Sequence, residues 1–566
     1  MYRNFSILNL LASAILEILS NSAYSRPAAP KPSALASSSS QSGGNLYLSW
    51  NHLPASFNLI SGNEELAKPI NTLVSASLVW MDYETWEPIP YLAENWDSSA
   101  NSLTIKFTLN SKATFSDSRP VSANDVVFTF DLIFDPAINA PELRAQFSWL
   151  RSWREIDSQT VEFELSRPNF TAIEQIGSVP ILPRSIFGKQ GHNFNRDFNY
   201  TLIGAGPYLL PEKTTTESKI IKFDRVKKWW GNKLPWAIGI FAHDVIEFRV
   251  IDAMNDALSS LQKNEIDAIE LTPINYVDWS NKITDDAFPS TKFLRLSYAA
   301  ENPNEWAGIA LNTRSPPCED LKFRVALQNL FDQAVFSKDL FGGRYIPIWG
   351  PFGIQNIDSS SFVTDTVKSI NLLESLRYNK FDVDGIRYRE VDGKKQRAEL
   401  SVLFSNPSNV QFLKQFVATA KTAGIQINLE NMDFSAALQK VESWEFQAFV
   451  VGWTDTPSLL LLFRQWSSKS ADLKGSLNYS GIAQKQIDKL IVEIERSSPQ
   501  KKRSALLAKL NEALTSQHPY IWRWKPNERL WIINIERVGL PSKTFQFTGN
   551  SLTAPPHIYW WSKMKS

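Results

Sequence analysis

The side chains that most often carry catalysis or bind metals are few in this chain and stand apart from one another. A single cysteine, Cys318, excludes an internal disulfide and any metal site built from several thiolates. None of the histidines has a histidine three or four residues away, so no helical metal-binding pair is encoded; they are His52, His192, His243, His518 and His557. Metal capture is therefore disfavoured, although distant histidines can meet in a folded chain.

Sequence motifs of the common enzyme classes are also missing. The chain contains no Gly-x-Ser-x-Gly, no His-Glu-x-x-His and no phosphate-binding loop. Asp382-Val-Asp384-Gly385 and Asp392-Gly393 look like calcium-loop fragments, but they lack EF-hand spacing, and Asp-Gly is a common hairpin turn. We predict a protein that is not an enzyme and carries no metal or cofactor. A hydrolase using an unrecognised carboxylate pair among the 58 acidic residues stays open.

Length and composition describe a large globular chain without a strong charge. The 566 residues are enough for two or three packed lobes rather than one core. A formal net charge of +1 gives no bulk attraction to nucleic acid. The aromatic content is high, with 20 Trp, 34 Phe and 15 Tyr. Large cores account for most of these rings, and an aromatic-lined cleft is expected for some of the tryptophans.

The N-terminal segment has the features of an export signal. Residues 1–25 combine Arg3, an apolar run interrupted by Glu17, and the small-x-small site Ala23-Tyr24-Ser25. A buried amphipathic helix is the alternative interpretation. Residues 26–44 are rich in Pro, Ala and Ser, which predicts a disordered tether. No cysteine follows the signal to carry a lipid, and no later apolar run approaches the roughly 18 residues that a membrane span needs.

Alternating and helical patterns predict an α/β chain. Leu46–Trp50 and Leu103–Leu109 alternate as strands. Ser122, with Asp125 three residues on, is typical of a capping box at a helix start. Residues 398–404, 410–423 and 425–429 form a predicted βαβ unit, and Asn264 and Gly424 are predicted left-handed helix ends.

Several motifs in a fixed order resemble the family 5 extracellular solute-binding proteins, the dipeptide- and oligopeptide-binding components of ABC importers. The motifs are Pro90-x-Leu92-Ala93-Glu94-x-Trp96, Gly204-x-Gly206-Pro207-Tyr208, Trp229-Trp230-Gly231, Leu258-x-x-Leu261-x-x-x-Glu265-Ile266-Asp267, and Ala310-Leu311-Asn312-Thr313 followed by Pro316-Pro317. The resemblance covers about residues 45–566, and Trp229–Pro235 looks like the branch that handles long peptides and microcin C-type antibiotics. One departure is Ser116, where the family usually has histidine.

The resemblance implies a type II periplasmic-binding-protein-like α/β fold with two large lobes, a hinge and an extra smaller domain. Lobe I is predicted to comprise residues 45–80, 204–310 and 520–566. The extra domain II takes residues 81–203, and lobe III takes residues 311–519.

The same resemblance implies a ligand cleft between the lobes. In the family, a Gly-Trp-x-x-Asp strand end places an aspartate against the α-ammonium group of the peptide. Here Gly452-Trp453-Thr454-Asp455 brings the aspartate one residue early, and one residue reverses the side-chain direction in a strand. Asp455 is therefore either the anchor or a loop-capping residue. Trp453, Thr454, Trp349 and Asn312 are further candidates for the cleft wall.

The function implied is a periplasmic protein that captures extended peptides through main-chain hydrogen bonds and delivers them to an inner-membrane ABC permease. Closure of the lobes about the hinge would bury the ligand. We expect a monomer that binds no nucleic acid. An oligosaccharide-binding protein of the same fold is the alternative, suggested by the aromatic content and the shifted Asp455.

Overall fold

A computed structural model describes residues 42–54, 56–62, 68–82, 87–99, 101–169, 171–188, 193–211, 215, 217–271, 282–299, 305–333, 345–352, 364–405, 409–454, 460–497, 500–526, 528–541, 558 and 560–563. The predicted signal peptide lies outside these ranges. The backbone N–H of Gly43 donates to the carbonyl of Ala242 at 2.8 Å, so contacts with the first lobe precede Asn45, where the prediction placed the first ordered residue.

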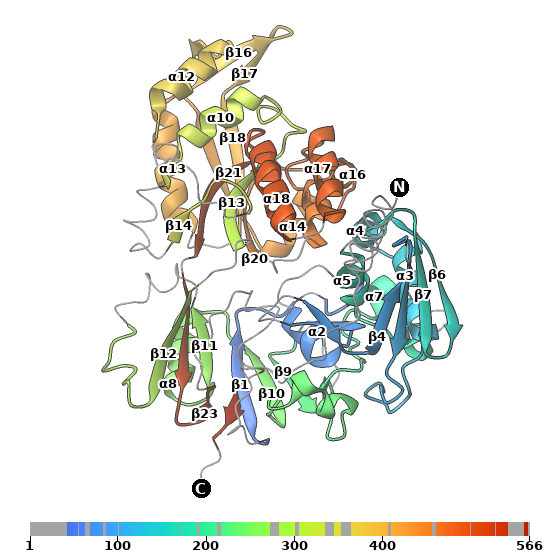
Figure 1. Cartoon of the computed structure of the whole chain (residues 1–566). Helices are drawn as coiled ribbons and strands as arrows, with labels where there is room; N and C mark the ends of the chain where they lie inside the picture. The colour runs from blue at the N-terminus through green and yellow to red at the C-terminus, as the bar shows by residue number, and fades with distance from the viewer. Residues whose placement is uncertain are drawn as a thin grey trace, which may run out of the picture.

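Lobe I is built on a seven-stranded mixed sheet (Figure 1). Its centre forms because β1 alternates, burying Leu46, Leu48 and Trp50, and pairs in parallel with β10 along its whole length. The strand order is β12 (Phe293–Ala299), β22 (Glu528–Asn534), β11 (Ala268–Leu271), β1 (Asn45–Trp50), β10 (Val245–Val250), β9 (Ile220–Arg225) and β8 (Tyr208–Leu209). Helices α2 (Lys68–Val74) and α8 (Met254–Gln262), the 3-10 turns η2 (Trp230–Lys233) and η3 (Pro235–Ala237), and the strand pairs β2–β3 (Val79–Met81, Pro88–Pro90) and β23–β24 (Val538–Gly539, Trp561–Ser562) complete this region.

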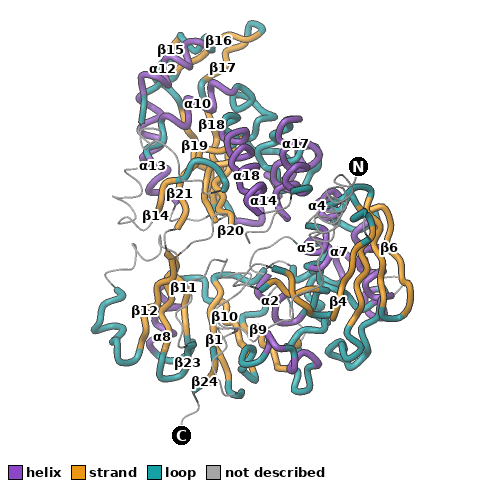
Figure 2. The backbone as a smooth tube through the Cα atoms, viewed as in Figure 1, coloured by secondary structure: helices purple, strands orange, loops and turns teal. Residues whose placement is uncertain are grey.

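Domain II packs a four-stranded antiparallel sheet against short helices (Figure 2). The sheet order is β4 (Ala93–Ser98), β5 (Thr104–Leu109), β7 (Thr160–Leu165) and β6 (Leu150–Asp157). The helices are α3 (Ala123–Phe134), α4 (Pro141–Gln146), α5 (Ala172–Gly177), α6 (Arg184–Phe187) and α7 (Phe194–Asp197). The predicted start of α3 is confirmed, because the N–H of Ser122 donates to the Asp125 carboxylate at 3.0 Å.

Lobe III holds a six-stranded sheet covered by helices. The strand order is β14 (Tyr345–Pro347), β21 (Tyr520–Pro526), β13 (Glu305–Leu311), β20 (Ala448–Thr454), β18 (Glu399–Phe404) and β19 (Gln426–Asn431). The predicted βαβ unit is confirmed, since β18 pairs in parallel with β19 across α13 (Val410–Thr422). The other helices are α10 (Leu321–Asn329), α12 (Thr366–Ser375), α14 (Phe434–Glu442), α15 (Leu460–Trp466), α16 (Ser468–Ala471), α17 (Lys485–Glu495) and α18 (Gln500–Thr515).

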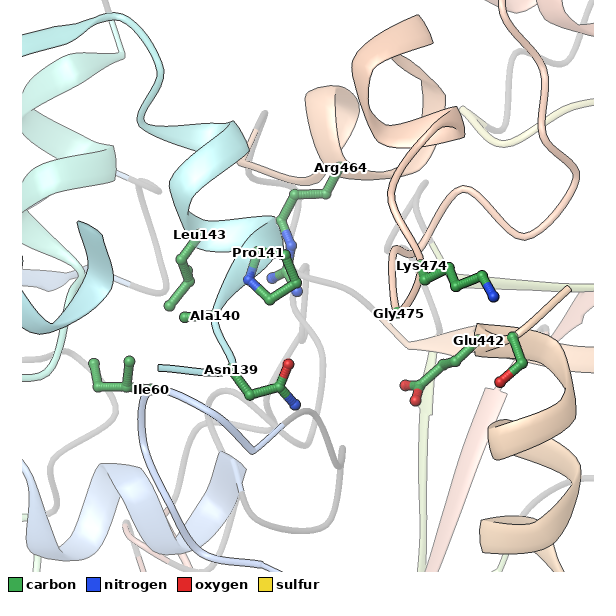
Figure 3. A pocket seen from close by; sticks show the side chains of 10 residues that line it. Ile60, Asn139, Ala140, Pro141, Leu143, Glu442, Arg464, Lys474 and Gly475 are labelled. Carbon is green, nitrogen blue, oxygen red and sulfur yellow. The ribbon is translucent and has the colours of Figure 1, made fainter. Parts of the chain in front are cut away.

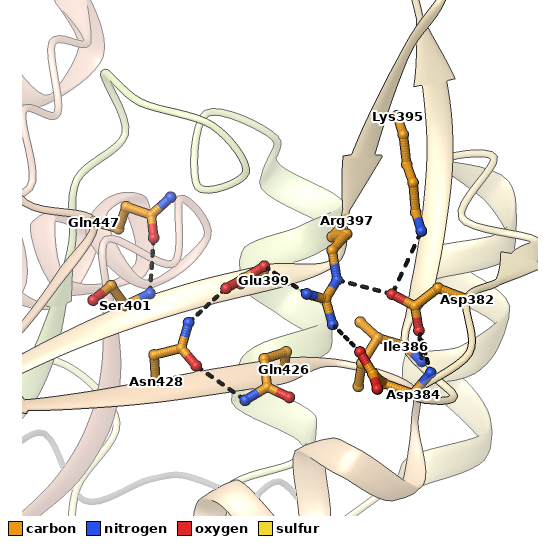
Figure 4. Close-up of polar contacts among 10 residues, drawn as sticks. All are labelled: Asp382, Asp384, Ile386, Lys395, Arg397, Glu399, Ser401, Gln426, Asn428 and Gln447. Carbon is orange, nitrogen blue, oxygen red and sulfur yellow. Dashed lines mark hydrogen bonds and ion pairs between the residues drawn. The ribbon is translucent and has the colours of Figure 1, made fainter.

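A small sheet of β15 (Lys380–Phe381), β16 (Arg387–Val391) and β17 (Lys394–Arg397) projects from lobe III. The acidic segments that look like calcium loops are turns here, as predicted. Asp392 and Gly393 both have positive φ, the geometry of a tight hairpin turn. The Asp382 carboxylate accepts from the N–H of Ile386 at 2.9 Å and pairs with Arg397 Nε at 2.9 Å (Figure 4).

Sheet pairing corrects two predicted lobe boundaries. Residues 305–310 and 520–526 were assigned to lobe I, but β13 and β21 pair with each other in the lobe III sheet. The chain thus crosses between Ala299 and Glu305 and returns between Pro526 and Glu528. The pattern of one strand cannot reveal this, because sheet membership depends on a distant partner. Residues 70–80 contain the end of α2 and the start of β2.

Candidate functional site

The start of β13 and the end of β21, where the chain enters and leaves lobe III, lie beside the end of β20. The register pairs Thr454, the last residue of β20, with Glu305, the first residue of β13. The crossing that leads into β13 starts at Ala299, and the return crossing follows Pro526 at the end of β21, which flanks β13 on its other side. Trp453 and Thr454, the last two residues of β20, therefore lie at the end of the lobe III sheet that is beside the hinge.

Trp453 packs inside lobe III. Its side chain is 8% exposed, its ring stacks on Tyr479 with centroids 5.3 Å apart, and the ring of Trp306 lies 5.9 Å away. Thr454 is described only as part of the β20 backbone, and Asp455 lies outside the described residues. The role of Asp455 as an amine anchor therefore stays a prediction.

Asn312 is fully buried and uses its amide inside lobe III. Its Nδ2 donates to the carbonyls of Phe446 at 2.8 Å and Trp444 at 3.2 Å, and its Oδ1 accepts from the N–H of Arg314. These bonds tie the end of β13 to the loop before β20. With no exposed surface, Asn312 presents no group to a ligand in this structure.

Trp349 is half-buried in the loop after β14. Its ring meets the His518 ring edge to face at 5.6 Å, and its carbonyl accepts from Asn511 Nδ2 at 3.1 Å. Burial lowers the pKa of His518 to about 4, so this histidine is neutral at physiological pH. Trp349 thus has part of its surface available, held by contacts to α18 and the loop after it.

A pocket that the sequence did not predict opens between domain II and lobe III (Figure 3). Its volume is about 250 Å³. One wall comes from the loop before α2 and from the start of α4. The other wall comes from α14, α15 and the turn after α16. The side chains that line the pocket include Ile60, Asn139, Leu143, Glu442, Arg464 and Lys474. The pocket thus exists because two separate parts of the chain face each other.

Burial raises the pKa of the Glu442 carboxyl above its ordinary value. Among the described residues, no side chain donates to or pairs with this carboxylate. Glu442 could have been noticed in the sequence only as an acidic residue at the end of a predicted helix, where a basic residue is preferred.

An ion pair also joins domain II to lobe III. Arg167, after β7, places Nη2 2.7 Å from Oε2 of Glu495, the last residue of α17. The Glu495 side chain is only 5% exposed, and the Arg167 side chain is 24% exposed. Burial raises the pKa of Glu495, and Arg167 opposes that shift.

Among the described residues, no group of three or more His, Cys, Asp or Glu side chains could hold a metal ion. Cys318 is buried, and burial raises its pKa to about 12, so it is an unreactive thiol. The same part of the chain has no helix with the length and apolar character that a membrane crossing requires.

Comparison with known proteins identifies the architecture. An oligopeptide-binding protein, AppA of Bacillus subtilis, is 23% identical over 544 residues, covering 93% of this chain and 92% of the relative. Its structure in complex with a nonapeptide matches with a TM-score of 0.78 at 20% identity, covering 93% of this chain and 100% of that chain. DppA of Helicobacter pylori, in complex with the peptide STSA, matches with a TM-score of 0.78 at 19% identity over 93% of this chain and 99% of that one.

A putative binding protein of Brucella melitensis is 23% identical over 498 residues, covering 81% of this chain and 78% of the relative. The predicted type II periplasmic-binding-protein-like fold is confirmed by these matches. The closer resemblance to the microcin C-type branch stays a prediction. The model of the bacterial extracellular solute-binding proteins, family 5 Middle, matches residues 87–473, and the chain belongs to this family.

Proposed function

We propose that this protein captures peptides in the space between its lobes and delivers them to an ABC permease of the inner membrane. The observation that carries this proposal is the family membership, together with a pocket whose two walls belong to different parts of the fold. The related AppA and DppA were solved with peptides bound. Because one fold hosts many ligands, the ligand class needs its own test.

The proposal includes a periplasmic, monomeric and non-catalytic protein. The apolar run and small-x-small site of residues 1–25 support export. The absence of known catalytic motifs from the sequence supports binding without turnover. A sugar ligand remains the competing class, because the aromatic content would also suit a carbohydrate cleft, but no relative described above is named for sugar binding.

Mass spectrometry of the small molecules released by denaturing the purified mature protein tests the proposal directly. We expect the released molecules to be a mixture of peptides. The mass of the protein itself should be unchanged, because the peptides are bound non-covalently. Oligomers spaced by a hexose mass would overturn peptide binding. Shortening of added peptides during incubation would overturn the non-catalytic assignment.

Asp455 is proposed as the partner of the peptide α-ammonium group, supported by the family pattern alone. Asp455→Asn should weaken binding of a peptide with a free N-terminus by about tenfold or more, since a hydrogen bond to a charged group contributes about 1.5–3 kcal/mol. N-acetylation of the peptide should produce the same loss in the unmodified protein and little additional loss in the variant. Thr454 and Trp349 are proposed to shape the neighbouring cleft wall, with Trp349 supplying the exposed part. Trp453 is proposed to support this wall from inside lobe III through its packing on Tyr479.

A further inference from the structure

Two glutamates of lobe III stand at the last position of their helices and face domain II. Glu442 ends α14, and Glu495 ends α17. The C-terminus of a helix carries partial negative charge, so a carboxylate there is disfavoured by roughly 0.3–1 kcal/mol. Each of the two carboxylates therefore destabilises its own helix, and a nearby positive charge would offset that effect.

Among the described residues, domain II supplies that charge to only one of them. Arg167 pairs with Glu495 at 2.7 Å. Within the described ranges, Glu442 has no such partner, although burial in the pocket disfavours its charged form. A half-buried carboxylate without a partner costs free energy that a bound cation would offset.

The basic residues of the same pocket do not neutralise Glu442. In Figure 3 the Lys474 ammonium group points away from the pocket, and it lies 5.7 Å from the centre of the Trp444 ring. Arg464 directs its guanidinium group toward Pro141 on the opposite wall. The raised pKa of Glu442 has burial as its cause, with no contribution from either cation, as expected if both are distant.

The wall opposite Glu442 suits an aliphatic chain that ends in a cation. The half-buried Leu143, with the almost fully buried Ile60 and Ala140, gives this wall a small apolar surface. Figure 3 shows the Asn139 carboxamide and the Glu442 carboxylate extending toward each other across the gap. Lysine and arginine side chains bury their methylene stems along such surfaces while their charged ends seek polar partners. At about 250 Å³ the pocket is smaller than the roughly 300–1,000 Å³ of sites that enclose whole ligands, so it fits one side chain or one chain end.

We propose that this pocket is a subsite for a cationic group of the peptide ligand, in which Glu442 pairs with an ammonium or guanidinium group and Asn139 accepts a hydrogen bond from it. The proposal rests on the proposed peptide-binding function. The cation is the side chain of a lysine or arginine residue, since the peptide N-terminus is assigned above to Asp455, and N-acetylated peptides test that assignment. Occupation of the subsite brings a wall of lobe III and a wall of domain II onto the same ligand group.

Isothermal titration of the mature protein, freed of ligand, with matched pentapeptides tests this subsite. One set carries lysine at each position of an alanine host, and parallel sets carry norleucine, which keeps the stem without the charge, or glutamate. We expect lysine to bind at least about tenfold more tightly than norleucine at one position, and we expect Glu442→Gln to reduce that ratio to below about threefold. Glu445→Gln, an exposed neighbour, is the matched control and should keep the ratio.

The outcomes separate the two proposals. If no peptide of any set binds, the proposed function fails. If peptides bind but lysine and norleucine are equal, or the preference survives Glu442→Gln, the subsite is overturned while peptide binding stands. A preference for glutamate at that position would assign the pocket to Arg464 and Lys474 and would also overturn it. N-acetylated peptides identify the source of the cation, because a loss on acetylation that disappears in Glu442→Gln assigns the subsite to the N-terminus.

Discussion

Domain II meets its two neighbours through contacts of opposite chemistry. Toward lobe I it shares one continuous hydrophobic core, in which Phe107 and Phe163 of its sheet belong to the same buried cluster as Leu46 and Phe248 of the lobe I sheet. Six rings where the chain leaves lobe I form what we call the aromatic junction: Trp80, Tyr91, Trp229, Trp230, Trp236 and Phe241.

Toward lobe III the contact contains charged and polar groups. It includes the Arg167–Glu495 ion pair and the pocket that contains Glu442 and Asn139, and helix α4 contacts α15 and α16. Apolar interfaces that continue a core are permanent, whereas small polar interfaces allow domains to separate. We therefore expect domain II and lobe I to move as one body, and lobe III to open and close against both.

Breaking the aromatic junction should have the largest effect. The Trp236 ring stacks on Trp80 at 4.3 Å, its Nε1 donates to the carbonyl of Pro90 at 3.0 Å, and the residue is 3% exposed. Trp236→Ala should lower the free energy of unfolding by about 3–5 kcal/mol, because it removes a large buried ring and leaves a cavity. Denaturant unfolding followed by circular dichroism measures the loss.

Val383→Ala is the control for this prediction, since that side chain is fully exposed on the projecting sheet and should change stability by less than about 0.5 kcal/mol. A Trp236→Ala variant as stable as the parent protein would contradict a shared core.

Acid should lower the stability of the apolar core that lobe I shares with domain II. His243 is buried beside Tyr208, whose hydroxyl donates to its carbonyl at 2.9 Å, and burial lowers the pKa of His243 to about 3. Because the pKa of His243 is lower in the folded than in the unfolded state, its contribution to stability is complete above the unfolded-state pKa of about 6.5. This contribution is lost progressively as pH falls toward the folded-state pKa of about 3. At pH 5 the loss from this residue alone is about 2 kcal/mol.

Unfolding free energies measured from pH 7 to pH 4 should therefore fall less steeply in His243→Gln, which does not titrate. Glu442 and Glu495 on the polar side have raised pKa values, so their contributions have the reverse sign, with stabilisation present at low pH and lost as pH rises. An unchanged pH profile in His243→Gln would exclude this histidine as a cause of acid sensitivity.

Removing one partner of the ion pair should weaken the polar contact. Arg167→Met leaves the Glu495 carboxylate buried without its partner, and we expect a loss of about 1–2 kcal/mol, less than for a fully buried pair because Arg167 is partly exposed. Since we expect lobe III to close on this contact, release of bound peptide should also be faster. A double-mutant cycle with Glu495→Gln measures the coupling.

In that cycle the double variant should regain part of the stability, since no charge is then left unpaired. Strict additivity of the two single changes would show that the pair contributes nothing to the contact.

The sequence predicted more of the fold than of the site, for identifiable reasons. The alternation of Leu46, Leu48 and Trp50 is local information, and the strand lies where it predicts. The strand at residues 520–526 was assigned to the wrong lobe because the apolar patterns of β21 and β22 do not say which sheet each joins. Trp453 shows a further limit, since a tryptophan in a core and one in a cleft wall have the same sequence pattern, and only packing separates them.

Glu442 illustrates what no local pattern reveals. An acidic residue at a helix end is unremarkable among 58 acids, and its meaning depends on a wall contributed by residues about 300 positions earlier in the chain. Asn139 is likewise an ordinary loop residue until the pocket brings it opposite that carboxylate.

The smallest expected effect is the change in stability of Glu442→Gln. It distinguishes a role of Glu442 in ligand binding from a role in stabilising the fold. Glu442→Gln removes a charge that the helix dipole and burial both disfavour, so the ligand-free protein should become slightly more stable, by about 0.3–1 kcal/mol at pH 7. Glu495→Gln, by contrast, should destabilise, because it leaves Arg167 without its charged partner. Thermal unfolding of both variants without ligand compares the two glutamates directly. A loss of stability in Glu442→Gln would mean that the carboxylate already has a structural partner, and the polar contact would then hold two ion pairs instead of one ion pair and one vacant binding position.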